Sequence, residues 1–275
     1  MIIGAMNHPA HDVIAEIRWI GEFGLEFIDL TLEPPGASSW RVNARDIAQA
    51  LKDHGLKVVG HTAYYLPMAS PFEGVRRAAV EEFKRCLDIF STLGARWMNM
   101  HPQAYAPMHD RSYIIERNIA TITDLLPMAR DCGVGLMIEN LPGDWNNVLQ
   151  LSQLLDPLPE LGLHLDIGHA NLQVARNTTD EILRAYGSRL RHVHLHDNKG
   201  GQHDLHLPLG CGNLDVRHTI SLLKRSGYDG TITLEVFSED KHYLLHSRDV
   251  LRETWDCAPD GPAQGKSLAV TSSAV

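Results

Sequence analysis

Short apolar runs recur along the chain, and longer segments with apolar positions three or four residues apart separate them. The runs are typical of buried strands, and the longer segments are typical of amphipathic helices. The strands are expected near residues 2–7, 26–32, 57–62, 97–101, 134–139, 162–166, 191–196 and 231–236. The helices are expected near residues 10–23, 43–54, 72–93, 112–132, 146–156, 176–187, 215–226 and 240–255. This alternation predicts an α/β protein with a parallel sheet and right-handed crossovers.

The number of alternating elements favours closure of the sheet into a (β/α)8 TIM barrel, formed as a single domain. The chain has 275 residues, and such barrels typically need about 250. An open doubly wound sheet is the competing fold, but it does not usually carry candidate ligands at the end of every strand. We expect the barrel to occupy residues 1–257. Residues 258–275 are rich in Ala, Gly, Pro, Ser and Gln without an apolar period, which predicts a disordered tail.

Residues at the ends of the predicted helices support these boundaries. Four glycines follow helical segments and fit the left-handed position after a helix: Gly55, Gly94, Gly133 and Gly227. Three polar residues are expected to cap helix N-termini: Asn43, Asn146 and Asp215.

Every predicted strand ends in or beside a residue that can bind a metal ion or carry a proton. The endings are Met6-Asn7-His8, Leu30-Thr31-Leu32-Glu33, Gly60-His61, Met100-His101, Ile138-Glu139, Leu165-Asp166, Leu195-His196 and Leu234-Glu235. In a parallel βα barrel the carboxyl ends of the strands meet on one face, so these side chains should converge. Side chains two residues apart share a face of a strand, which places His192, His194 and His196 together.

Four of these residues form a minimal metal site: Glu139, Asp166, His194 and Glu235. Each comes from a different strand, and their phase along the strands points them into the barrel. Three carboxylates and one imidazole suit Mn²⁺, Mg²⁺, Co²⁺ or Zn²⁺ with positions open to substrate oxygens. Taken singly, each residue could equally be a capping or salt-bridged group; their shared phase favours a site.

Five further residues extend the candidate ligand set: His61, His101, His169, Asp204 and His206. The first two end strands, the third follows Asp166 in the sequence Asp-Ile-Gly-His, and the last two lie in the loop after residue 196. All nine together are enough for two or three metal ions. Metal ions about 3.5–4 Å apart can clamp the attacking and leaving oxygens of a phosphate ester.

Composition narrows the function classes only in part. The chain is 44% hydrophobic with a mean hydropathy of -0.18, and its apolar runs are far shorter than the roughly 20 residues that span a bilayer. Without the pattern of a signal peptide, a cytoplasmic location is expected and no membrane association. The net charge of -9 argues weakly against broad nucleic-acid binding, although bound divalent cations would cancel part of it.

Seven ordered segments carry a resemblance to a known family. They are His61-Thr-Ala-Tyr-Tyr, Met100-His-Pro, Ile138-Glu-Asn, Leu165-Asp-Ile-Gly-His-Ala-Asn, His192-Val-His-Leu-His-Asp, Asp204-Leu-His-Leu-Pro-Leu-Gly-Cys-Gly-Asn-Leu-Asp and Leu234-Glu-Val. Together they resemble the xylose-isomerase-like TIM-barrel superfamily over roughly residues 1–255. That group holds the sugar phosphate isomerases and epimerases and the related endonuclease IV, of AP endonuclease family 2.

The resemblance implies two different uses of the candidate ligands. In the isomerases and epimerases, positions that match Glu139, Asp166, His194 and Glu235 hold one divalent metal ion, and the two glutamates also move protons. In endonuclease IV, all nine matching positions hold three zinc ions. The chain keeps all nine, but it begins Ile-Gly-Ala-Met-Asn-His where that nuclease has Gly-Ala-His-x-Ser. It also has Gly210-Cys211-Gly212 where the family usually has Gly-Glu-Gly.

We therefore expect a metal-dependent isomerase or epimerase of a sugar or sugar phosphate, an enzyme of carbohydrate metabolism. Its cofactor would be one to three ions of Mn²⁺, Zn²⁺, Co²⁺ or Mg²⁺. Glu139 and Glu235 would be the catalytic pair, acting as base and acid through an enediolate. The expected substrate contacts are His169, Glu33, His8, Lys199, Tyr64 and Trp145.

Two alternatives remain open. The first is an endonuclease IV-like zinc phosphodiesterase acting on phosphate esters or abasic DNA, in which His61, His101, Asp204 and His206 become essential ligands. A DNA enzyme should carry phosphate-positioning cations near its site, and the Lys and Arg residues here form no basic stripe, which favours a small sugar-like substrate over nucleic acid. The second alternative is a non-catalytic metal-binding barrel, and the retained glutamate pair argues against it.

Overall fold

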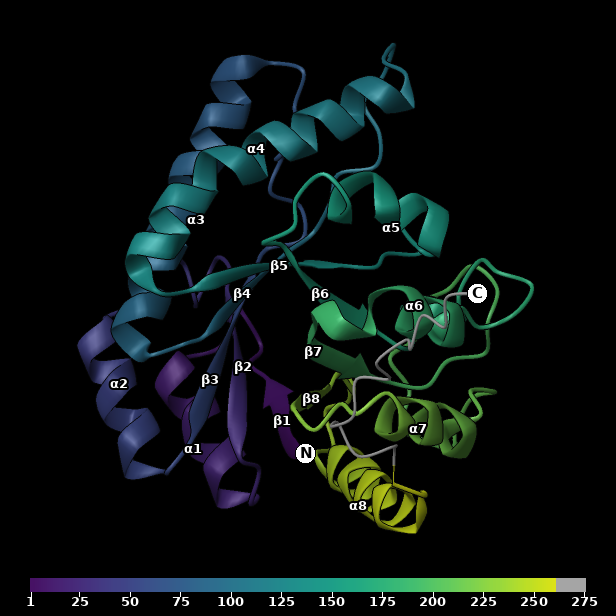
Figure 1. Cartoon of the computed structure of the whole chain (residues 1–275). Coiled ribbons are helices and arrows are strands. Elements are labelled where there is room, and N and C mark those ends of the chain that lie inside the picture. Colours follow the sequence, from purple (N-terminus) through teal and green to yellow (C-terminus); the bar gives the residue numbers. More distant parts are fainter. Residues whose placement is uncertain (261–275) are drawn as a thin grey trace, which may run out of the picture.

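The computed structural model describes residues 1–260 and contains all eight predicted strands and all eight predicted α-helices (Figure 1). The strands are β1 (Ile2–Met6), β2 (Phe27–Leu32), β3 (Lys57–Thr62), β4 (Trp97–Met100), β5 (Gly135–Glu139), β6 (Gly162–Asp166), β7 (Leu190–Leu195) and β8 (Thr231–Leu234). The α-helices are α1 (Val13–Glu22), α2 (Ala44–Asp53), α3 (Glu73–Leu93), α4 (Arg111–Cys132), α5 (Val148–Leu155), α6 (Thr179–Tyr186), α7 (Val216–Arg225) and α8 (His242–Cys257). The prediction of a disordered tail falls mainly on residues 261–275, which lie outside the described residues.

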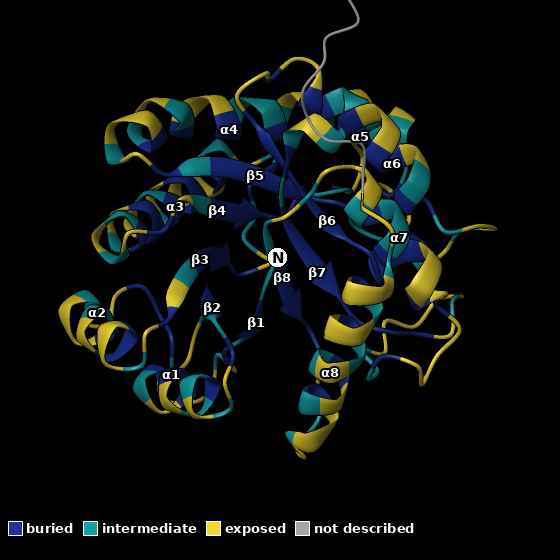
Figure 2. Cartoon of the chain, turned by 60° about the horizontal axis from the view of Figure 1, so that its bottom comes forward, coloured by how far each residue is buried: buried dark blue, intermediate teal, exposed yellow. Residues whose placement is uncertain are grey.

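The strands form one closed parallel barrel in the order β1 to β8, and β8 pairs with β1 to complete the ring. The helices surround the strands, with exposed outer faces and buried inner faces around a buried barrel (Figure 2). This arrangement confirms the predicted (β/α)8 TIM barrel. Among residues 1–260, no helix has the length and apolarity that crossing a membrane would require.

Most predicted helix boundaries are confirmed. Asn43 and Asp215 cap α2 and α7 by accepting hydrogen bonds from backbone N–H groups of the first turn. The four predicted glycines have the expected positive φ angles: Gly55, Gly94, Gly133 and Gly227. The prediction that Asn146 caps a helix is wrong, because its buried amide donates instead to the carbonyl oxygens of His169 and Leu172. Asn147 caps α5 in its place.

A small apolar cluster closes the amino-terminal end of the barrel interior. It contains Phe27, Val59 and Met137, with Ile2 and Trp97 packed against it. Two glycines make room for the rings: a Cβ on Gly4 would lie 2.6 Å from the ring of Phe27, and one on Gly135 would lie 2.2 Å from the ring of Trp97. The larger core lies between the strands and the helices. The polar residues of the barrel interior therefore lie between this apolar cluster and the carboxyl ends of the strands.

Asp197 organises the loop that follows β7. It is fully buried; its Oδ1 accepts hydrogen bonds from the backbone N–H groups of Asn198 (2.8 Å) and Leu214 (3.0 Å), and its Oδ2 from those of Gly210 (2.9 Å) and Gly212 (2.9 Å). A Cβ on Gly212 would lie 2.0 Å from the carbonyl oxygen of Asn198, so no larger residue fits there. This buried carboxylate holds the loop that carries two of the candidate ligands, Asp204 and His206.

We expect Asp197→Ala to lower the free energy of unfolding by about 3 kcal/mol or more, because it leaves buried N–H groups without an acceptor. Chemical denaturation followed by circular dichroism measures this. The matched control is Asp215→Ala, which removes an exposed helix cap and should cost about 1 kcal/mol. Equal effects of the two substitutions would contradict the role assigned to Asp197.

Candidate metal centre and active site

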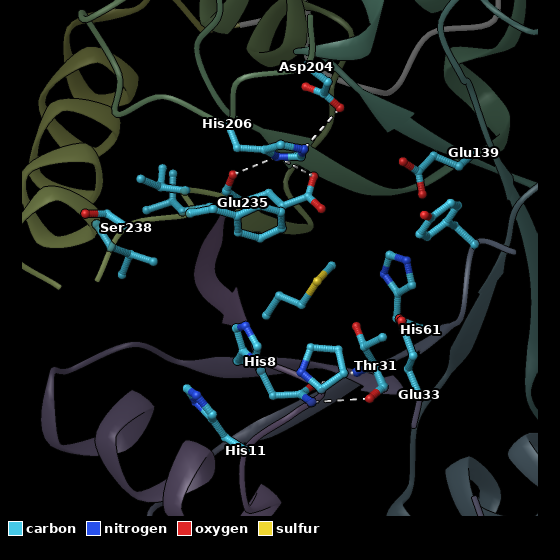
Figure 3. Close-up of a pocket in the computed structure, with 18 of the residues that line it drawn as sticks. His8, His11, Thr31, Glu33, His61, Glu139, Asp204, His206, Glu235 and Ser238 are labelled. Atoms are coloured by element: carbon cyan, nitrogen blue, oxygen red, sulfur yellow. Dashed lines mark hydrogen bonds and ion pairs between the residues drawn. The ribbon is translucent and has the colours of Figure 1, made fainter. Parts of the chain in front are cut away.

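A cavity of about 1010 Å³ opens at the carboxyl ends of the strands (Figure 3). Seven of the nine predicted ligands line it: His61, His101, Glu139, His169, Asp204, His206 and Glu235. The other two, Asp166 and His194, are fully buried and contact residues of the lining. The structure thus brings all nine residues to one place, although they come from six strand ends or the loops that follow them.

The first group of ligands joins β3, β4 and β5. Nε2 of His61 lies 3.2 Å from Nε2 of His101, which lies 3.0 Å from Oε2 of Glu139. The same Oε2 accepts a hydrogen bond of 2.5 Å from the amide of Asn99. The candidate nitrogen and oxygen ligand atoms of these three residues lie within 4.8 Å of one another and could hold one metal ion.

The second group joins β6, β7 and the end of β8. Nδ1 of His194 lies 3.1 Å from Oε2 of Glu235 and 3.8 Å from Oδ2 of Asp166. Asp166 is fixed at its backbone, where its N–H donates to Oδ1 of Asn140 at 2.7 Å. Its Oδ1 also accepts from the backbone N–H of His169 at 2.8 Å.

The third group centres on Asp204 in the loop after β7. Its Oδ2 lies 3.0 Å from Nε2 of His169 and 3.0 Å from Nε2 of His206. His169 connects this group with the other two, since its Nδ1 lies 3.3 Å from Oε1 of Glu139 and 3.4 Å from Oδ2 of Asp166. His206 has a φ of 45°, a left-handed conformation that is uncommon for residues other than glycine, although Asn, Asp and His adopt it more often than most. Its ring stacks on Phe237 at 4.2 Å.

The carboxyl and imidazole groups of these residues influence one another's pKa. Burial opposes ionisation of Glu139, but the nearby rings of His164 and His101 hold the pKa of its carboxyl well below the ordinary value. Burial also opposes protonation of His194, yet Glu235 and Asp29 hold its pKa well above the ordinary value. The Glu139 carboxyl is therefore held in its ionised form, and the His194 imidazole in its protonated form.

His206 shows the same effect. Burial lowers the pKa of its imidazole, but Glu235 and Asp204 outweigh burial and raise that pKa to about 9. A proton then occupies this histidine at neutral pH, and a metal ion would have to displace it.

The residues present fit one or more divalent cations. Oδ2 of Asp166 and Nε2 of His196 are buried, and within residues 1–260 neither has a hydrogen-bond partner. Buried polar atoms are nearly always paired, so unpaired ones at a cluster of acids and imidazoles indicate an ion. Carboxylate oxygen and imidazole nitrogen are ligands for Zn²⁺, Mn²⁺ and Co²⁺.

Two predicted substrate contacts are not brought to the site. Trp145 is fully buried in the core, with the guanidinium of Arg111 4.4 Å from its ring. Lys199 is exposed and does not line the cavity. The remaining predicted contacts do line it: His8, Glu33, Tyr64 and His169.

Two residues outside the nine predicted ligands lie beside them: Asp29, which the sequence pattern did not single out, and His196, which it placed at a strand end but not in the ligand set. Asp29 lies inside β2 and contacts His194. His196 has Nε2 3.4 Å from Oδ1 of Asp166, and its ring stacks on His206 at 4.2 Å. The signal for Asp29 was its phase, two residues before Thr31 on the interior face of the strand; for His196 it was the shared face with His194.

Comparison with known sequences gives an uncharacterised relative and relatives named as enzymes of two kinds. An uncharacterised protein from Methanocaldococcus jannaschii is 30% identical over 239 residues, which cover 82% of this chain and 79% of that protein. A probable endonuclease 4 from Aquifex aeolicus is 25% identical over 246 residues, 81% of this chain and 86% of that protein. A ketose 3-epimerase from Arthrobacter globiformis is 25% identical over 247 residues, 84% of this chain and 80% of that protein.

Solved structures share the fold over nearly the whole chain. A D-tagatose 3-epimerase-like protein has a TM-score of 0.83 at 24% identity, covering 93% of this chain and 97% of its own. An IolI protein with a bound zinc atom has a TM-score of 0.75 at 17% identity, covering 93% and 95%. The family model described as xylose isomerase-like TIM barrel matches residues 17–256.

Proposed function

We infer that this chain, which belongs to the xylose isomerase-like TIM barrel family, is a divalent-metal-dependent epimerase or isomerase of a keto sugar. The observation that carries this proposal is the placement of Glu139 and Glu235. One ends β5 and the other directly follows β8, and both line the same cavity from different sides (Figure 3). Two carboxylates that reach a substrate from two sides can remove a proton from one face of a carbon and return one to the other face.

The surroundings of the two glutamates suit this role. Glu139 is held ionised by His101 and His164, so its carboxylate can accept a proton from the carbon beside a ketone. Glu235 contacts His194 at 3.1 Å and His206 at 3.5 Å, two imidazoles that can supply and take back its proton. A divalent cation, when bound by the second group of ligands, would polarise the ketone and make that carbon more acidic.

The rest of the cavity offers groups that bind sugar hydroxyls. Glu33 and His8 line the wall near β1 and β2, and burial raises the pKa of the Glu33 carboxyl above its ordinary value. His169 faces the cavity between the metal groups. Carboxyl and imidazole groups of this kind form hydrogen bonds with hydroxyls in either direction.

The cavity wall favours a sugar over a polyanion. Among the described lining residues, Lys241 is the one lysine or arginine, and its amine lies 4.3 Å from the ring of Trp19. Glu33 and Glu239 also line the cavity. Nucleic-acid enzymes generally position phosphates with several cations, and this wall carries more carboxyl groups than lysine and arginine side chains.

A zinc phosphodiesterase like endonuclease 4 is the second candidate. It is favoured by one observation, the convergence of all nine residues into three connected ligand groups. The two candidate functions act on different substrates, a keto sugar and a phosphate ester, so one protein preparation can be assayed for both.

The test incubates the purified protein, loaded separately with Mn²⁺, Co²⁺ and Zn²⁺, with ketoses that include D-tagatose, D-psicose and L-ribulose. Chromatography then follows the appearance of the isomeric sugar. The same preparations are incubated with a DNA duplex that carries one abasic site. We expect sugar interconversion with at least one ketose and intact DNA. Strand cleavage at the abasic site with all ketoses unchanged would replace the proposed function with the second candidate.

A further inference from the structure

Asp29 is a carboxylate in the middle of the barrel, below the cavity. It lies on β2, is fully buried, and is not part of the predicted ligand set. Its Oδ2 lies 2.6 Å from Nε2 of His194, 3.2 Å from Nε2 of His192 and 2.9 Å from Oγ1 of Thr233. Burial raises the pKa of this carboxyl, but His61, His192 and His194 outweigh burial and hold that pKa well below its ordinary value.

The other oxygen of Asp29 faces a different ligand histidine. Oδ1 lies 3.5 Å from Nδ1 of His61. Both atoms are buried, and among residues 1–260 neither has a hydrogen-bond partner. A small rotation of the His61 ring would bring this pair into hydrogen-bond range. Each carboxylate oxygen thus faces one candidate ligand histidine, Oδ2 facing His194 and Oδ1 facing His61, and these two histidines belong to different ligand groups.

Both histidines present their second nitrogen to a ligand group. Nδ1 of His194 faces Glu235 and Asp166. Nε2 of His61 lies 3.2 Å from Nε2 of His101. In each ring, therefore, the nitrogen that faces Asp29 is opposite the nitrogen available to a metal ion.

A neutral imidazole carries one N–H and one lone pair, and the hydrogen bond made by one nitrogen decides which nitrogen can bind a metal. Metal-binding histidines commonly donate their other N–H to a carboxylate, which fixes the tautomer and the ring orientation. Loss of such a partner typically weakens metal binding about 10- to 100-fold.

We propose that Asp29 is a positioning residue shared by two metal positions, its Oδ2 accepting from His194 and its Oδ1 from His61. One buried carboxylate then orients a ligand in each of two groups and links their metal binding. The inference rests on the metal dependence in the proposed function, and it is independent of which sugar is the substrate.

The competing role for Asp29 is direct coordination. Candidate ligand atoms of Asp29, His61 and His194 lie within 4.8 Å of one another, which is compatible with an ion held among them. The 2.6 Å contact with Nε2 of His194 favours a hydrogen bond instead, because that contact already engages the oxygen and the nitrogen with each other.

The experiment compares Asp29→Asn with Thr233→Val in the full-length protein. Both substitutions keep the side-chain size, and both remove a polar interaction of the Asp29 side chain, but only the first alters the group that faces His194 and His61. Zinc affinity is measured by competition with a chromophoric chelator, bound zinc by mass spectrometry, and the melting temperature by calorimetry on chelator-treated protein.

We expect Asp29→Asn to weaken the binding of two zinc ions about 10- to 100-fold. The zinc affinities of Thr233→Val should stay within about threefold of the wild type. Similar melting temperatures of the two metal-free variants would separate positioning from a general structural role. Unchanged affinity for every zinc ion in Asp29→Asn would overturn the shared role. Complete loss of one ion at saturating zinc would show direct coordination instead. If the wild type took up no metal, the proposed function would fail as well.

Discussion

Replacing either Glu139 or Glu235 by glutamine is expected to lower kcat by about 100- to 10,000-fold, the usual contribution of a general acid or base. The amide keeps the shape of the side chain but cannot take up or release the proton. Because the epimerisation needs a group on each face of the carbon, either substitution alone should lower kcat to this extent. Steady-state rates with the best ketose from the panel measure this.

The matched control is Glu239→Gln. Glu239 also lines the cavity, but it is exposed and lies on the rim after β8, so its loss should change kcat less than about threefold. Circular dichroism and metal content of all three variants are measured alongside, and rates are compared at equal metal occupancy, because Glu139 and Glu235 are also candidate metal ligands. Activity close to that of the wild type in both Glu139→Gln and Glu235→Gln would remove these residues from the mechanism.

Removal of the metal ions is expected to abolish activity and to lower the melting temperature by about 10 °C. Binding at a ligand concentration about 1,000 times Kd stabilises a protein by about 4 kcal/mol, and 1 kcal/mol corresponds to about 2–4 °C for a domain approaching this size. The physical reason is the set of buried carboxylates, Glu139, Asp166 and Glu235, which repel one another more strongly without a cation.

Calorimetry before and after treatment with a chelator measures the shift, and return of the metal should restore both activity and melting temperature. Binding should also release protons, because His206, with its pKa raised to about 9, is protonated in the metal-free protein at neutral pH. Titrations in buffers of different ionisation enthalpy detect that release. Equal melting temperatures and equal rates with and without metal would contradict metal binding by these three groups of residues.

Strand phase predicted the barrel and the candidate ligands at the strand ends, and the loops that follow β6 and β7 on the same face supply His169, Asp204 and His206. Alternation places Glu139 and Asp166 on the interior face, and the parallel topology brings strand ends together whatever their separation in the chain. The barrel then gathers side chains as distant as His61 and Asp204 around one cavity.

Strand phase could not predict how deeply each side chain is buried or where it lies along the barrel axis. Asp29 stands inside its strand rather than at the end, and only the closed barrel brings it against His194, 165 residues away in the chain. Trp145 was expected to contact substrate because it follows a strand in a loop. The backbone of that loop folds back through mutual hydrogen bonds between Leu141 and Trp145, which helps place the ring in the core.

The most direct test of proton transfer by this chain is isotope exchange from solvent. The metal-loaded protein is incubated with the ketose panel in D₂O, and proton and deuterium NMR locate deuterium in recovered substrate and product. The proposed function predicts deuterium at the carbon beside the ketone, and none above background with Glu139→Gln or Glu235→Gln. Cleavage of abasic DNA by the same preparation, with no deuterium in any ketose, would contradict it.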